Sequence, residues 1–161
     1  ISNNFFGGLA GFGNTTGSAN NFFGAGSGFC NTTGSGNNFF GVEAGYQNTT
    51  GNYNNFIGGA AGCTQTAGDR NVAIGYNVQL PLTTGSDQLA IGSGSTAWIS
   101  GNSNFDVGIG IANPTSKLQV LGGDIRVGIN TSQGMILTSP DGTKYRLIVA
   151  NGGALSTVAV P

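Results

Sequence analysis

The sequence predicts an all-β fold built from tandem repeats, a β-solenoid or β-roll with a unit of 17 residues, followed by a small β module. Three observations predict it: a five-residue motif that recurs every 17 residues, 31 glycines in 161 residues, and a charged content of only 7%. Glycine costs roughly 1 kcal/mol per helical position relative to alanine, so long helices are not expected. A unit this short cannot bury its own apolar face, and stacked neighbours must close the core.

The repeat opens with a motif of the form Asn-Asn-Phe-Phe-Gly, first seen at residues 3–7. Six copies follow without insertion, and they start at Asn3, Asn20, Asn37, Asn54, Asn71 and Gln88. A seventh copy, at residues 106–110, comes one residue late. The second half of the unit also repeats, as in residues 14–17 (Asn-Thr-Thr-Gly). We therefore expect two short strand-like pieces per unit, joined by glycine-containing turns, in a repetitive shaft over residues 1–104.

Two neighbouring columns of the motif are apolar. The fourth position is bulky in every copy, and we expect it to form a structural ladder at roughly 4.8 Å per coil. That ladder contains Phe6, Phe23, Phe40, Ile57, Ile74 and Ile91. The third position is also apolar and reads Phe5, Phe22, Phe39, Phe56, Ala73 and Ala90. Adjacent strand residues point to opposite faces, so one column can line the coil while the other needs cover, for which a homo-oligomer is the simplest source.

Glycine holds the fifth position of the motif in all six copies. The column contains Gly7, Gly24, Gly41, Gly58, Gly75 and Gly92. Glycine is the default residue where φ is positive or where two backbones approach closely. We therefore expect this column to mark a corner of the coil.

Cys30 and Cys63 are the two cysteines. They occupy adjacent columns of coils two apart, so about 10 Å would separate them along the stack, whereas a disulfide needs Cα atoms within about 7 Å. We therefore interpret both as small buried apolar residues. A link between identical positions of two chains stays open.

The repeat pattern changes at about residues 102–106, which predicts a C-terminal β module over residues 105–161. Four of the five basic residues follow residue 116, and they are Lys117, Arg126, Lys144 and Arg146. Residues 135–139 and 143–149 are strand-like, and the Pro-Asp-Gly between them is typical of a turn, because Pro fixes φ and Gly supplies the left-handed position. The apolar end, residues 154–161, is expected to add a further strand.

The composition argues against most catalytic and ligand-binding classes. There is no histidine for general-base work, and the six carboxylates are scattered at least 17 residues apart. Five basic residues cannot supply a nucleic-acid patch, and no stretch approaches the roughly 18 apolar residues of a membrane helix. Calcium-binding solenoids carry Asp where this chain has Asn and Thr. We expect no enzyme activity, no cofactor, no metal, no nucleic acid and no membrane insertion.

A column of threonines raises an alternative function. It contains Thr15, Thr32, Thr49, Thr66 and Thr83 at one position of successive coils. A flat, exposed threonine ladder on a monomer is typical of an ice-binding solenoid. The other interpretation is that these side chains form hydrogen bonds along the stack next to a turn.

The motifs resemble those of known fibres. The units at residues 3–7 and 14–17 resemble shaft repeats of bacteriophage tail fibres and, more distantly, the head repeats of trimeric autotransporter adhesins, whose units are usually shorter. Residues 107–120 are similar to a segment common near the ends of phage fibres and bacterial surface proteins, and residues 139–147 to C-terminal modules of phage tail proteins. The resemblance spans nearly the whole chain and implies an elongated, parallel homotrimer.

The sequence thus predicts a structural protein of a virion tail fibre, an extracellular viral protein that supports host attachment through a bacterial surface glycan or protein. The alternatives are a bacterial adhesin or extracellular filament subunit and, second, the monomeric ice-binding solenoid. For contact with a glycan, the candidate stacking residues are Trp98, Tyr145 and Tyr53. For each of these three, packing in the core or shaft is the competing interpretation.

Overall fold

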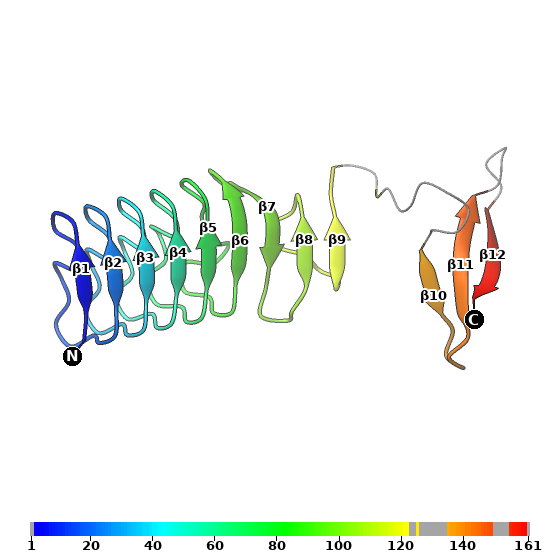
Figure 1. Ribbon diagram of the computed structural model, residues 1–161, viewed down its shortest axis with the longest axis horizontal. Coiled ribbons are helices and arrows are strands. Elements are labelled where there is room, and N and C mark those ends of the chain that lie inside the picture. Colours follow the sequence, from blue (N-terminus) through cyan, green and yellow to red (C-terminus); the bar gives the residue numbers. More distant parts are fainter. Residues whose placement is uncertain (1, 123–124, 126–134, 150–154, 161) are drawn as a thin grey trace. The chain divides into compact units, whose positions relative to one another are not determined.

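A computed structural model describes residues 2–122, 125, 135–149 and 155–160 of the chain. The described residues form β-strands, turns and bends, and none of them is helical. Internal contacts divide the chain into two compact units, Ile1–Gly122 and Gly123–Pro161 (Figure 1). Each unit is described by itself below.

The first unit begins as a β-solenoid in which every coil contributes one short strand. The strands are β1 (Asn4–Phe6), β2 (Asn21–Phe23), β3 (Asn38–Phe40), β4 (Asn55–Ile57), β5 (Val72–Ile74) and β6 (Leu89–Ser93). Consecutive strands pair in parallel, each residue with its equivalent one repeat later, as Phe5 does with Phe22. The predicted 17-residue β-solenoid is therefore confirmed.

Three further strands continue the same sheet beyond the regular repeats. They are β7 (Thr96–Gly101), β8 (Val107–Ile109) and β9 (Leu118–Val120). β7 pairs antiparallel with both β6 and β8, and β8 then pairs in parallel with β9, which completes a nine-stranded sheet in sequence order (Figure 1). The sheet thus runs through residues 104 and 105, where the repeat pattern changes. The late seventh copy of the motif is β8, which follows an inserted antiparallel strand.

The core of the solenoid is a column of stacked rings inside the coils. Phe22, Phe39 and Phe56 have no exposed surface. Their ring centroids lie 4.8 and 4.9 Å apart, with planes within 5° of parallel. Ala73 and Ala90 continue the column, also fully buried. The third position of the motif is therefore the one that lines the coil.

Buried asparagines form a second internal column, at the first position of the motif. Asn20, Asn37, Asn54 and Asn71 have no exposed surface. The side chain of each satisfies two backbone groups: Asn37 Oδ1 accepts from the N–H of Asn54 at 2.9 Å, and Asn37 Nδ2 donates to the Gly51 carbonyl at 2.8 Å. Because a buried backbone group without a partner is costly, this column provides the hydrogen bonds that the non-strand backbone of each coil lacks.

The glycine column turns the chain out of each strand. Five of its six members have φ between 122° and 145°, and Gly92 is the exception. A Cβ on Gly41 would lie 2.4 Å from the Gly58 carbonyl oxygen, and one on Gly92 would lie 2.5 Å from the Thr96 carbonyl oxygen. Positive φ and close backbone approach therefore occur together in the first five coils, and close approach alone remains at the sixth.

The second unit contains a three-stranded antiparallel sheet of β10 (Ile136–Thr138), β11 (Lys144–Val149) and β12 (Leu155–Val160). The strands lie where the apolar runs predicted them. The predicted turn joins β10 and β11: Gly142 has φ of 87°, and its N–H donates to the Ser139 carbonyl at 2.9 Å. Arg126, which the sequence places in this region, lies outside the described residues.

Candidate interaction surface

The outward face of the sheet carries the bulky column of the motif. Phe23, Phe40 and Ile57 are 38%, 41% and 46% exposed, whereas their inward neighbours are fully buried. Phe6 is 73% exposed, and its ring stacks on that of Phe23 at 5.7 Å. The predicted ladder thus exists and lies on the outside of the coil.

Strand register extends this column over all nine strands. Ile91 pairs with Ile99, Ile99 with Ile109, and Ile109 with Val120. We call the complete column the outer stripe, and it contains Phe6, Phe23, Phe40, Ile57, Ile74, Ile91, Ile99, Ile109 and Val120. The 17-residue period does not predict the last three members, because β7 runs in the opposite direction. Their local signal is the alternation in Val107-Gly108-Ile109 and Leu118-Gln119-Val120.

A second outward row flanks the stripe and changes character along the sheet. In β1–β4 it is a chain of asparagine amides, each Nδ2 donating to the next Oδ1 at 2.7 to 2.8 Å. These residues are Asn4, Asn21, Asn38 and Asn55. From β5 onward, the paired positions are Val72, Leu89, Gly101, Val107 and Leu118. The apolar surface therefore widens from one row to two.

Neither outward row contains a charged residue. With about 4.8 Å between strands, eight steps make the stripe roughly 38 Å long. Monomeric soluble proteins rarely expose contiguous apolar patches larger than a few hundred Å², and larger ones mark interaction sites. The outer stripe is therefore the surface of this unit that most needs a partner.

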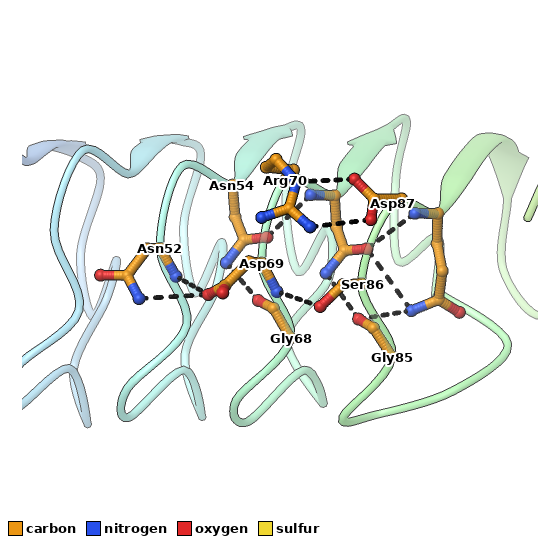
Figure 2. A network of polar contacts seen from close by, with 10 residues as sticks. Asn52, Asn54, Gly68, Asp69, Arg70, Gly85, Ser86 and Asp87 are labelled. Atoms are coloured by element: carbon orange, nitrogen blue, oxygen red, sulfur yellow. Dashed lines mark hydrogen bonds and ion pairs between the residues drawn. The ribbon is translucent and has the colours of Figure 1, made fainter. Parts of the chain in front are cut away.

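The acids and bases of the described solenoid pair with each other away from the stripe. Arg70 donates to both carboxylate oxygens of Asp87, at 2.7 and 2.8 Å (Figure 2). The hydrogen bond from Arg70 is the main cause that lowers the pKa of Asp87 below its ordinary value. Asp106 has a similar arrangement, since hydrogen bonds from Lys117 and then Asn102 lower its pKa. These carboxylates are held ionised, which suits a stabilising role better than proton transfer.

Asp69 takes part in a column of turn residues rather than in a catalytic pair. Its Oδ1 accepts from the backbone N–H of Asn52 at 2.7 Å, and its own N–H donates to Ser86 Oγ at 3.0 Å (Figure 2). Within the described residues, no group of three or more His, Cys, Asp or Glu side chains is placed to hold a metal ion.

The three aromatic residues considered for glycan contact lie on three separate elements. Tyr53 is 63% exposed at a turn of the third coil, where its ring lies against Gly36 of the preceding coil. Trp98 is 62% exposed on β7. Tyr145 is 37% exposed on β11 of the second unit. The described contacts do not bring Tyr53 and Trp98 together into one site.

The threonine column forms hydrogen bonds along the stack. Thr15 Oγ1 donates to the Thr32 carbonyl at 2.9 Å, and Thr32 Oγ1 donates to the Thr49 carbonyl at 3.0 Å. Thr49 and Thr66 repeat the contact with the coil that follows each of them. The hydroxyl hydrogens of these four residues are therefore directed into the solenoid.

Cys30 and Cys63 are free, in agreement with the expected lack of a link between them. The expectation that both are buried is wrong, because each is half-buried at an outer turn. Cys63 Sγ also accepts a hydrogen bond from Gln79 Nε2 at 3.4 Å. Cys63 occupies a column that is aromatic in the first three coils, which the sequence alignment of the coils already displays.

No helix long and apolar enough to cross a membrane occurs among the residues that the structure describes. No family model, curated protein or solved structure matches the chain.

Proposed function

We propose that this chain is a non-enzymatic structural segment of an extracellular fibre, in which copies of the solenoid pack in parallel through their outer stripes. The observation that carries the proposal is the continuity of the stripe across all nine strands. A surface that only one coil exposed would need no such explanation, whereas nine apolar rows in register match a long, uniform interface.

The repeat itself favours a second copy of the chain as the partner. A copy placed in parallel and in register presents the same side chain at each height, so rings meet rings at the N-terminal end and branched aliphatic side chains meet one another from β4 onward. Apolar burial at roughly 25 cal/mol per Å² rewards every coil equally. We propose three copies, because the motifs resemble those of homotrimeric fibres.

The role that we propose for the assembly is mechanical. Parallel rungs of backbone hydrogen bonds and the internal asparagine column resist unwinding of each coil, while the stripes hold the chains together. Such a shaft fits a phage tail fibre that supports attachment to a host surface, with a bacterial glycan or protein as the receptor. A bacterial adhesin or filament subunit with the same architecture is the alternative.

Native mass tests the proposal. We expect light scattering after size exclusion to give about three times the 16.1 kDa of one chain. Ile57→Asp places a charge in the stripe and should convert the assembly to monomers that keep their far-UV circular dichroism. Thr50→Asp, at an exposed turn position, is the matched control and should leave the mass unchanged. A monomeric wild-type chain would contradict the proposal and favour the ice-binding alternative, which predicts thermal hysteresis.

A further inference from the structure

A second exposed aromatic column runs along the turns of the first three coils and then stops. Phe12 stacks on Phe29 at 5.2 Å and Phe29 on Tyr46 at 5.0 Å, with planes within 9° and 2° of parallel. The next position of the column is Cys63, which has no ring. Tyr46 therefore has one ring face on Phe29, and no described aromatic ring stacks on the other.

A hollow lies where the next ring would be. It has a volume of about 200 Å³, is open to solvent, and is lined by Glu43, Tyr46, Gln47 and Cys63. We call it the Tyr46 slot. Drug-sized ligands occupy pockets of roughly 300–1,000 Å³, so this slot suits a single ring.

The walls of the slot are held in place by the solenoid. The Gln47 N–H donates to the Cys63 carbonyl at 3.0 Å, and the Tyr46 carbonyl accepts from the Cys30 N–H at 2.9 Å. On the far side, Gln79 Nε2 donates to Cys63 Sγ at 3.4 Å. Binding to such a site costs little ordering of the protein, because the backbone on both sides already belongs to hydrogen-bonded coils.

The lining combines one flat apolar surface with polar groups of both kinds. The free face of Tyr46 is an apolar platform with a phenol at its end. Glu43 offers acceptors only, while the Gln47 amide offers both donors and acceptors. A ligand that matches this set has an apolar face and neighbouring hydroxyls that both donate and accept. A guanidinium group only donates, and would leave the Gln47 donors without partners.

We propose that the Tyr46 slot binds one pyranose ring of a glycan, with the apolar face of the sugar on Tyr46 and its hydroxyls on Glu43 and Gln47. The aromatic residues selected from the sequence do not include Tyr46, because its free face appears only when the coils are stacked. The slot goes beyond the structural role of the chain and lies within two neighbouring coils, so it does not depend on the number of chains in the fibre.

Saturation-transfer-difference NMR tests the slot on the whole chain. The probes are the methyl glycosides of glucose, galactose, mannose and N-acetylglucosamine. We expect at least one to bind in the millimolar range, with transfer strongest at the ring protons of its apolar face. Cys63→Phe should fill the slot with a fourth ring, keep the thermal midpoint, and reduce binding at least tenfold. Tyr46→Ala provides a second variant, with the same expected loss of binding.

Tyr53→Ala, which removes an exposed aromatic side chain outside the slot, should bind the same glycoside as the wild type. Equal binding by wild type and by folded Cys63→Phe would overturn the proposal, as would a lack of binding by all four glycosides. Binding of N-acetyl-arginine methylamide instead of any glycoside would assign the slot to a cationic side chain and overturn the sugar. Native mass, measured on the same samples, separates these outcomes from a failure of the fibre assembly.

Discussion

The two faces of strands β1–β4 carry the same kinds of side chain in opposite environments. Phe39 lies between two rings inside the coil and has no exposed surface, whereas Phe40, the next residue, is 41% exposed. Both columns are spaced by one coil and both stack. The difference is which neighbours share each face: the inner column shares its face with buried asparagines and the corner glycines, and the outer column with exposed asparagines.

This contrast teaches that stacking regularity alone does not identify a core. The inner face is completed within the chain, because a first-position Asn and a fifth-position Gly bring the rest of the coil close to the strand. The outer face has equal regularity and nothing of the chain opposite it. Stability of one coil and assembly of several chains should therefore respond to different substitutions at adjacent residues.

The largest difference is expected between Phe39→Ala and Phe40→Ala. Removal of the buried ring should lower the free energy of unfolding by about 3–5 kcal/mol, the usual cost of a Phe-to-Ala cavity. Denaturant unfolding at several protein concentrations measures it. The loss in Phe39→Ala should be independent of concentration, whereas the effect of Phe40→Ala should grow on dilution, because it acts through association. Equal, concentration-independent losses would remove the distinction between the faces.

Gly58→Ala and Gly59→Ala compare two adjacent glycines at one corner. Gly58 has φ of 122°, and a Cβ there would lie 2.4 Å from the Gly75 carbonyl oxygen. Strain and overpacking together should cost about 2–4 kcal/mol. At Gly59 a Cβ would meet only the Tyr76 ring, at 3.4 Å, so the thermal midpoint should change little. A tolerated alanine at residue 58 would mean that the coils are further apart than described.

Asn54→Ala and Asn55→Ala separate the buried amide column from the exposed one. Asn54→Ala leaves the Asn71 N–H and the Gly68 carbonyl without their partners. Buried groups left unpaired cost about 1–3 kcal/mol, so we expect a loss of about 2–3 kcal/mol in denaturant unfolding. Asn55→Ala should cost less than about 0.5 kcal/mol, as is usual for surface substitutions. Similar losses at both positions would contradict the assigned role of the inner column.

The smallest expected effect is the pH dependence from the Arg70–Asp87 ion pair. A carboxyl whose pKa is lower in the folded than in the unfolded chain stabilises the fold above its unfolded pKa, and this contribution is lost as the pH falls through the folded pKa. For Asp87 the loss should begin below its ordinary value of 3.8. Thermal melts from pH 5 to 2 should therefore show a shallower decline in Asp87→Asn than in wild type. Identical slopes would indicate that the exposed pair is screened by solvent.

Much of the solenoid was predictable because its signals are local and repeated. The period, the parallel register and the corner glycines follow directly from columns such as Phe5 and Gly7. The direction of each column was not predictable, since alternation places Phe5 and Phe6 on opposite faces without saying which is inside. β7 was missed because its pairing with β6 is antiparallel and contains an irregularity between Ile91 and Gly92.

The buried asparagines and the Tyr46 slot required the stacked coils themselves. An Asn column in a glycine-rich sequence is typical of turns, and only the hydrogen bond from the Asn54 N–H to Asn37 Oδ1 identifies it as interior. The end of the aromatic column at Cys63 is visible in the aligned coils, but a free ring face has meaning only once Tyr46 and Phe29 are known to stack. Features that arise between coils are therefore where sequence reasoning stopped.

The central claim is that the outer stripe is the face on which chains meet, and interchain cross-linking tests it directly. In a Cys30→Ser, Cys63→Ser background, Ile57→Cys should form interchain disulfides on mild oxidation, because parallel copies bring identical stripe positions together. Thr50→Cys, on an exposed turn of the same coil stack, should remain largely uncross-linked. A chain that is trimeric by mass but cross-links through residue 50 and not through residue 57 would contradict the claim.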